Sequence, residues 1–258
     1  MVDTLHLVLG ALSGVLVGFS LGLVGGGGSI LAVPLMVYVV GVHSPHVAIG
    51  TSALAVAVNA ATGLLQHARA GTVRWRCGAM YAGAGILGAL AGSTLGKNFD
   101  GQRLLFLFAI LMLVVGALML RDRRAVGTEG AQCNRRNAPK VLTYGLGTGA
   151  FSGFFGIGGG FLIVPGLIAS TDMLMINAVG TSLIAVTAFG VTTAANYAFS
   201  GLVDWLLAAV FIAGGVAGGF GGTTLARRLS GDGQLKTVFA ILIFVVALYM
   251  LWKSWTAL

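Results

Sequence analysis

The stretch VGGGGSILAVP, residues 24–34, returns later in the chain as FGIGGGFLIVP, residues 155–165. Each copy is followed by a second shared stretch, AIGTSALAV at residues 48–56 and AVGTSLIAV at residues 178–186. The glycines before them also correspond, because Gly14, Gly18 and Gly22 match Gly145, Gly149 and Gly153. Two homologous halves whose apolar segments are broken by glycine are typical of transporters built from internal repeats.

The composition indicates a membrane protein. The chain has 258 residues, of which 57% are hydrophobic and 9% charged, with a mean hydropathy of +0.96. A soluble domain carries about 25% charged residues, so this chain has too little polar surface to solvate a globule. The net charge of +8 does not indicate nucleic-acid binding, because the basic residues lie in short loops between apolar segments.

Each half contains five apolar segments, and a spanning helix needs about 20 residues. The third, fourth and fifth segments of each half are long enough or nearly so, whereas the second of each half and the first of the second half are short. The predicted segments are residues 5–24, 29–42, 47–65, 77–95 and 104–120, then 142–155, 161–170, 176–198, 205–225 and 237–252. We therefore expect an all-α polytopic membrane protein in which each repeat has a glycine-broken pair of short helices followed by three spanning helices.

The halves, residues 1–120 and 141–258, are joined by a basic, glycine-containing linker at residues 121–140, which the positive-inside rule places in the cytoplasm. If each half crosses the membrane an odd number of times, the repeats are inverted, and 12 of the 15 Lys and Arg residues lie on the linker's side. Parallel halves would give a weaker split of 10 to 5. We expect inverted repeats with both termini outside.

The two glycine-rich stretches, here called the glycine joints, are residues 25–28 and 156–160. Consecutive glycines disfavour a continuous helix, by about 1 kcal/mol each relative to alanine. Unwound backbone at membrane depth is tolerated only where it is buried in protein or lines a cavity. The helix after each joint would present free N–H groups and a positive dipole end to an anion. The simpler interpretation is a close-packed bend without a ligand.

The second pair of motifs, here called the GTS motifs, is Gly50-Thr51-Ser52 and Gly180-Thr181-Ser182. Their hydroxyls can bind an anion, bond to carbonyls of their own helix, or join neighbouring membrane helices. Because they accompany the glycine joints in both halves, we predict that they belong to the same site. The predicted substrate-binding residues are Gly25, Gly26, Gly27, Gly28, Ser29, Thr51, Ser52, Gly156, Gly158, Gly159, Gly160, Thr181 and Ser182.

Other residues have simpler predicted roles. Asn59, Gln66 and Asn196 are expected to form interhelical hydrogen bonds. Cys77 and Cys133 support neither a disulfide framework nor a metal site. The glycines are followed by no P-loop Lys-Thr or Lys-Ser, and GIGGGF departs from the dinucleotide fingerprint. We expect neither enzymatic activity nor a cofactor nor a bound metal.

The chain resembles the sulfite exporter TauE/SafE family. Its members carry a glycine-rich motif that ends in proline and is followed by a GTS motif, and here both occur twice, on either side of a basic linker. The resemblance covers nearly the whole chain and is carried by GGGGSILAVP, GIGGGFLIVP, AIGTS and AVGTS. It implies a secondary transporter in a bacterial inner membrane that moves sulfur-containing anions such as sulfite or sulfonates.

The sequence therefore predicts alternating-access transport of a small anion through a midplane site between the repeats. A passive anion channel and a membrane scaffold without a substrate are the alternatives. The expected partners are the anion and the lipid bilayer, with no nucleic acid, and a homodimer is an assembly that the sequence leaves open. All seven acidic residues lie at termini, in loops or at segment ends, so we expect no carboxylate proton relay at the bilayer centre.

Overall fold

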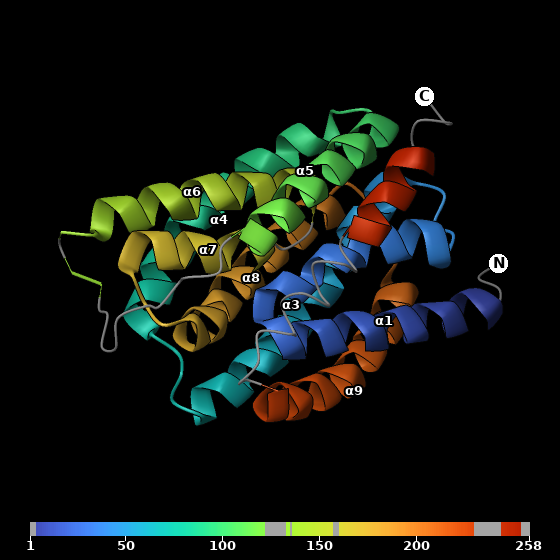
Figure 1. The fold of residues 1–258 in the computed structure, drawn as a ribbon. Coiled ribbons are helices and arrows are strands. Elements are labelled where there is room, and N and C mark those ends of the chain that lie inside the picture. Colours follow the sequence, from blue (N-terminus) through green and yellow to red (C-terminus); the bar gives the residue numbers. More distant parts are fainter. Residues whose placement is uncertain (1–3, 122–132, 135, 157–159, 230–243, 254–258) are drawn as a thin grey trace.

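The computed structural model describes residues 4–121, 133–134, 136–156, 160–229 and 244–253, and the described part is all-helical (Figure 1). In chain order the elements are α1 (Thr4–Val24), the 3-10 helix η1 (Gly25–Leu31), the single turn α2 (Ala32–Pro34), the π-helical turn η2 (Leu35–Val39), α3 (Pro45–Arg69), α4 (Trp75–Lys97), α5 (Gly101–Arg121), α6 (Ala138–Phe155), α7 (Gly160–Thr171), α8 (Met175–Ala198), α9 (Trp205–Leu229) and a short last helix, Phe244–Lys253.

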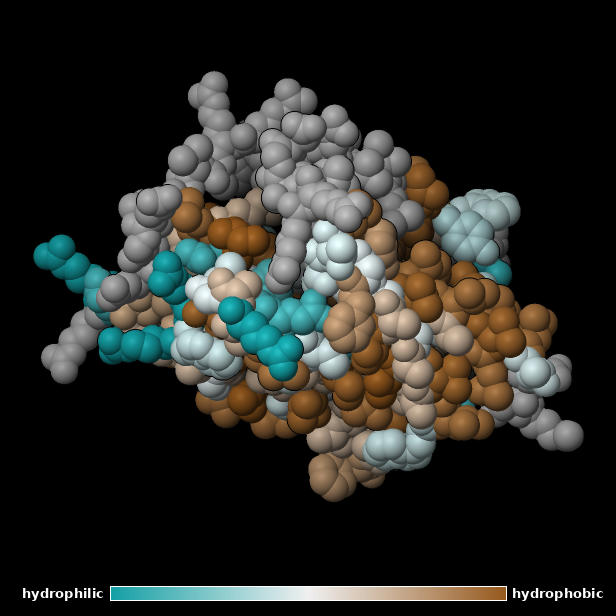
Figure 2. All heavy atoms as spheres, turned by 90° about the horizontal axis from the view of Figure 1, so that it is seen from below, coloured by the Kyte–Doolittle hydropathy of each residue, from teal (hydrophilic) through white to brown (hydrophobic). Residues whose placement is uncertain are grey.

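The helices have the length and surface of membrane spans. In the described part, five helices are long and apolar enough to cross a bilayer, namely Thr4–Leu23, Pro45–Arg69, Trp75–Lys97, Met175–Ala198 and Trp205–Leu225. Large apolar side chains such as Leu12 and Leu16 of α1 and Phe220 of α9 are exposed. Figure 2 shows that the described surface on this side is largely hydrophobic, with hydrophilic side chains gathered toward one end.

The predicted segments correspond to these elements, with one clear difference at a helix boundary; residues 237–243 of the last predicted segment lie outside the described residues. Between α1 and α3 the chain forms only short helical pieces, η1, α2 and η2, as the glycines and Pro34 predict. α6 begins at Ala138, four residues earlier than the predicted segment, because Pro139 lies in its first turn, where proline suits a helix. Lys140 therefore belongs to the helix and not to the linker.

Glycine stripes form the two tightest helix contacts, which pair α1 with α9 and α4 with α6. An added Cβ would collide with a backbone carbonyl of the partner helix. On α1, Gly14, Gly18 and Gly22 face Phe211, Gly215 and Gly219; on α6, Gly145, Gly149 and Gly153 face Tyr81, Gly85 and Ala89. Small residues at this spacing let helix backbones approach closely in lipid. Residue numbers rise together along both pairs, so each pair is parallel.

The paired helices belong to two bundles, each built from both halves of the sequence. In the first bundle α3 lies against α9, with Asn59 at Gly215; in the second α8 lies against α4, with Phe189 at Gly85. The first bundle is therefore α1, α3 and α9, and the second is α4, α6 and α8.

The two bundles meet along α3 and α8, which run antiparallel. Gly63 of α3 lies against Leu183 of α8, whereas Gly190, further along α8, lies against the earlier α3 residues Ala53 and Ala57. The end of α3 and the starts of α4 and α8 therefore share one end of the molecule, here called the Arg74 end. The starts of α3 and α9 and the ends of α4 and α8 share the other, here called the Lys97 end.

A disulfide between Cys77 and Cys133, with the Cα atoms 5.3 Å apart, corrects the expectation that the cysteines are unconnected. Cys77 is in the first turn of α4 and Cys133 is a linker residue five positions before α6. The pairing could not be predicted from the sequence, because the two residues are 56 positions apart and only the fold brings them together. The bond attaches the linker to the second bundle at the Arg74 end.

The α4–α6 contact yields a direct stability test. Gly149→Ala places a methyl group against the Gly85 carbonyl, and overpacking of this kind costs roughly 1–3 kcal/mol. Gly147→Ala on the same helix is the control, because a Cβ there meets nothing within 4 Å. We expect G149A to lower the thermal unfolding temperature in detergent and G147A to leave it unchanged or raise it. Equal effects would contradict the described packing.

Candidate functional site

The first glycine joint ends α1 and turns the chain back on itself. Gly25 has φ +66°, a left-handed conformation that glycine adopts readily and that commonly terminates helices. Gly28 lies against the backbone of Ser20 and Leu21 in α1, where no side chain would fit. Gly26 and Gly27 belong to the same 3-10 turn, and Ser29 is fully buried in it.

The second glycine joint begins in the same way. Gly156 follows α6 with φ +68°, and α7 starts at the buried Gly160. Ile157, Gly158 and Gly159 lie outside the described residues, so the two predicted binding glycines among them have no described geometry. Pro165 is inside α7, which is only 12 residues long, as the sequence predicts.

Each glycine joint contacts the GTS region of the other half. A Cβ at Gly25 would meet the side chain of Val179, which directly precedes Gly180. Correspondingly, a Cβ at Gly156 would meet Ile49, which directly precedes Gly50. These contacts connect the first bundle to the second at two places. The structure therefore places each joint next to the residue that precedes the GTS motif of the opposite half.

The two GTS threonines make equivalent hydrogen bonds. Thr51 Oγ1 accepts the Asp204 N–H at the start of α9, and Thr181 Oγ1 accepts the Arg74 N–H at the start of α4, both over 2.9 Å. Both threonines are fully buried. Each hydroxyl thus satisfies a backbone donor of the opposite half at a helix terminus, a structural role that the sequence did not indicate.

The remaining GTS residues also have packing partners. Ser52 Oγ donates to the Ile49 carbonyl and Ser182 Oγ to the Val179 carbonyl, over 3.1 and 2.7 Å. Gly50 lies against the Leu202 carbonyl, and a Cβ at Gly180 would stand 2.8 Å from Thr72 Oγ1. In this conformation both serine hydroxyls therefore donate their hydrogen bonds to carbonyls of their own helices.

The motifs form two groups and not one midplane cluster. Thr51 and Ile49 lie near the Lys97 end, and Thr181 and Val179 near the Arg74 end. Gly63 of α3 faces Leu183, two residues beyond Thr181, so the 12 residues from Thr51 to Gly63 separate the groups by about 18 Å at 1.5 Å per residue. The expectation of a single shared site does not hold for this conformation.

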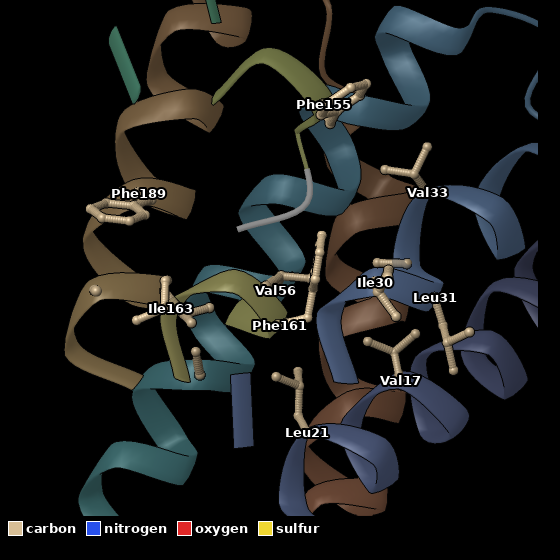
Figure 3. Close-up of a cluster of buried hydrophobic side chains, with 14 of the residues drawn as sticks. Val17, Leu21, Ile30, Leu31, Val33, Val56, Phe155, Phe161, Ile163 and Phe189 are labelled. Carbon is tan, nitrogen blue, oxygen red and sulfur yellow. The ribbon is translucent and has the colours of Figure 1, made fainter. Parts of the chain in front are cut away.

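An apolar cluster fills the space between the two groups. Figure 3 shows Val56 of α3 and Phe161 of α7 at its centre, with Ile30 of η1 and Ile163 of α7 nearby. These side chains are at most 3% exposed. The short segments after both joints, η1 and α7, contact each other here. Among the described residues, this part of the centre is therefore lined by apolar side chains.

Charged side chains stay away from the interior. Among the described residues, no Asp, Glu, Lys or Arg is buried. Asp100 and Asp172 are exposed and Asp204 is half-buried, and the Asp204 carboxylate accepts the Leu207 N–H in a helix cap. One cation nevertheless adjoins a GTS motif, because Arg74, whose backbone N–H donates to Thr181, is half-buried and its side-chain Nε is buried.

The larger polar residues divide into two kinds. Asn196 forms the predicted interhelical bonds, donating to Ser93 and Thr94 of α4, while Lys97 Nζ donates to its side-chain oxygen over 2.8 Å. Asn59 does not fulfil the same expectation: it is 4% exposed, and neither of its amide atoms has a hydrogen-bond partner. Sequence alone could not distinguish these cases, because both are asparagines within apolar helices.

The threonine bonds can be tested through stability. Thr51→Val leaves the Asp204 N–H without an acceptor and should destabilise the protein by roughly 1–3 kcal/mol, whereas Thr51→Ser keeps the hydroxyl and most of the stability. Thr181→Val should behave alike through Arg74. Because the sites are far apart, the costs should add. Thermal unfolding of these three variants and of the T51V/T181V double variant measures these costs; wild-type stability in T51V would exclude the bond.

The chain is similar in sequence to a known family of membrane proteins. The family model described as sulfite exporter TauE/SafE matches residues 10–250. A "probable membrane transporter protein" of Xylella fastidiosa (strain Temecula1) is 55% identical over 248 residues, covering 95% of both chains. The probable membrane transporter protein YdhB of Bacillus subtilis is 28% identical over 83% of this chain and 88% of its own.

No solved structure matches the chain significantly. The family model spans nearly all of the sequence, including both glycine joints and both GTS motifs, and the 55% identical relative covers the same length. The chain is therefore a membrane transporter protein of the sulfite exporter TauE/SafE family.

Proposed function

We propose that this transporter moves a small anion, an oxidised sulfur compound such as sulfite or a sulfonate, across a bacterial inner membrane by alternating access. The observation that carries the proposal is the double contact between a glycine joint of one half and the GTS region of the other. Two such units, made of different halves at different ends, provide what a carrier needs to expose a site first to one side and then to the other.

The chemistry of both units suits an anion. Glycine N–H groups at the joints carry no side chain that would block close approach, and η1 and α7 begin there. Thr51 and Thr181 accept N–H groups, so each hydroxyl hydrogen can still be donated to an oxyanion. We assign substrate contacts to Gly25, Gly26, Gly27, Gly28, Ser29, Thr51, Ser52, Gly156, Gly158, Gly159, Gly160, Thr181 and Ser182.

Antiparallel packing of α3 against α8 supports an inverted-repeat mechanism. These helices occupy equivalent positions in the two halves. The equivalent helices α1 and α6 also run in opposite directions, because α1 is parallel to α9 and α6 is parallel to α4. Inverted repeats give a carrier two conformations of similar energy that open to opposite sides. The bundles would rock along the α3–α8 contact, and opening at either end would part the apolar cluster around Val56 and Phe161.

Two observations disagree about which side of the membrane the Arg74 end faces. The basic residues Arg69, Arg74 and Arg76 lie at the Arg74 end together with the linker, which favours a cytoplasmic location. The Cys77–Cys133 disulfide lies at the same end, and disulfides persist mainly in oxidising compartments. We give the charge distribution more weight because it involves 12 basic residues, and we propose that both termini are periplasmic.

Single-cysteine labelling decides the orientation. In a variant without Cys77 and Cys133, we would introduce Ala70→Cys at the Arg74 end and Phe199→Cys at the Lys97 end; both positions are exposed. A membrane-impermeant thiol reagent added to intact cells should label Phe199→Cys alone, and both sites after permeabilisation. Labelling of Ala70→Cys alone would reverse the orientation, and labelling of both in intact cells would contradict inversion of α3 and α8.

Flux in proteoliposomes tests the transport proposal. We expect saturable uptake of at least one of sulfite, thiosulfate, a sulfonate and sulfate, accelerated by the same anion on the opposite side. Unitary currents without saturation would indicate a passive channel. The absence of flux for all of these anions would indicate a membrane scaffold without a substrate.

Glycine substitution tests whether the joints take part. Gly27→Val should reduce flux at least about tenfold by blocking close approach of the anion, while the protein still elutes as a folded species. Gly83→Val is the matched control, because a Cβ at that position meets nothing within 4 Å. Wild-type flux in G27V would place the binding site elsewhere.

A further inference from the structure

Among the described residues, several buried serine and threonine hydroxyls share one hydrogen-bond pattern, which Ser13, Ser152 and Thr193 break; the buried Tyr197 hydroxyl also has no partner. Ser13 belongs to α1 of the first bundle, whereas Ser152 and Thr193 both belong to the second. Five buried serine and threonine side chains donate to a carbonyl three or four residues earlier in their own helix, which is the usual solution in apolar surroundings. They are Ser52, Ser93, Ser170, Thr171 and Ser182. Ser152 of α6 and Thr193 of α8 are 0% exposed and have no hydrogen-bond partner.

The Ser152 and Thr193 hydroxyls lie at the same level of the second bundle. Gly153, next to Ser152, packs against Ala89 and the backbone nitrogen of Ser93 in α4. Asn196, one turn after Thr193, donates to Ser93 Oγ over 2.6 Å. Both hydroxyls therefore flank the same turn of α4, on two helices, α6 and α8, that contact each other.

Their place along the bundle is between the Lys97 end and the apolar centre. Ser152 is one turn before Gly156, the first residue of the second joint, and Thr193 is one turn after Phe189. A buried hydroxyl without a partner costs free energy, so a site that keeps two of them needs something that they bind. The half-buried Lys97 donates to the Asn196 side chain, which in turn donates to Ser93, so the nearby groups are hydrogen-bond donors and one cation. The complementary ligand is therefore one with several hydrogen-bond acceptors.

We propose that Ser152 and Thr193 form a binding subsite for an oxyanion, at which both hydroxyls donate to its oxygens on the Lys97 side of the apolar centre. The inference rests on the proposed anion transport and adds a step to it, an intermediate position between the second joint and the middle of the membrane. Hydroxyl donors without charge bind weakly enough to release the ion, which a transit position requires.

Neighbouring threonines provide a matched pair of variants. Thr193→Val removes an unpartnered hydroxyl, whereas Thr192→Val removes one that donates to its own helix at Ala188 over 2.7 Å. Ser152→Ala is matched by Ser170→Ala, whose hydroxyl donates to Leu167. With sulfite as the probe, we expect T193V and S152A to raise the apparent KM about three- to tenfold each, and T192V and S170A to change it less than about twofold.

Thermal stability without and with sulfite provides the second readout. T193V and S152A should unfold at the same temperature as the wild type or higher when no ligand is present, and should lose most of the stabilisation that sulfite gives the wild type. Equal KM values for T193V and T192V, with wild-type sulfite stabilisation in T193V, would overturn the subsite and leave transport intact. If the wild type neither carries sulfite nor is stabilised by it, both proposals fail for this anion.

Discussion

Close contact between helix backbones is the constraint on which the rest of this structure depends. Lipid tails are as apolar as leucine, so burying leucine between helices gains little in a bilayer, and van der Waals contact must hold the helices together. The stripes at Gly14, Gly18 and Gly22 and at Gly145, Gly149 and Gly153 supply that contact. They fix α1 on α9 and α4 on α6, and these two pairs carry the glycine joints to the positions where they meet Val179 and Ile49.

A membrane protein must also satisfy its backbone polar groups internally, and this requirement accounts for the threonines of the GTS motifs. The Asp204 and Arg74 N–H groups lie at the first turns of α9 and α4, where a helix has no partner of its own for its backbone donors. Thr51 and Thr181 accept these N–H groups, and the glycine before each threonine makes room for the chain that it caps. A structural and a substrate-binding role are compatible here, because a hydroxyl can accept one hydrogen bond while it donates another.

The sequence predicted local features well and pairing poorly. The glycine runs predicted where α1 and α6 end, and small residues at the four-residue spacing of Gly145 and Gly149 are typical of a helix packing face. The identity of the partner could not follow, because a glycine stripe fits the backbone of any helix. For the same reason the Cys77–Cys133 bond and the Thr51–Asp204 bond, which join residues far apart in the chain, were not foreseen. The separation of the two GTS motifs followed only when the antiparallel order of α3 and α8 was known.

Exchange of helices between the halves also sets an order of assembly. Gly145 of α6 meets Tyr81 of α4, 64 residues earlier, so the second bundle can begin to form while the chain is still being made. Gly14 of α1 packs against Phe211, which is synthesised 197 residues later. Until then the glycine face of α1 contacts lipid or a helper protein. At about 5–20 residues per second, this interval is roughly 10–40 s. α1 is thus made well before the helix that it packs against.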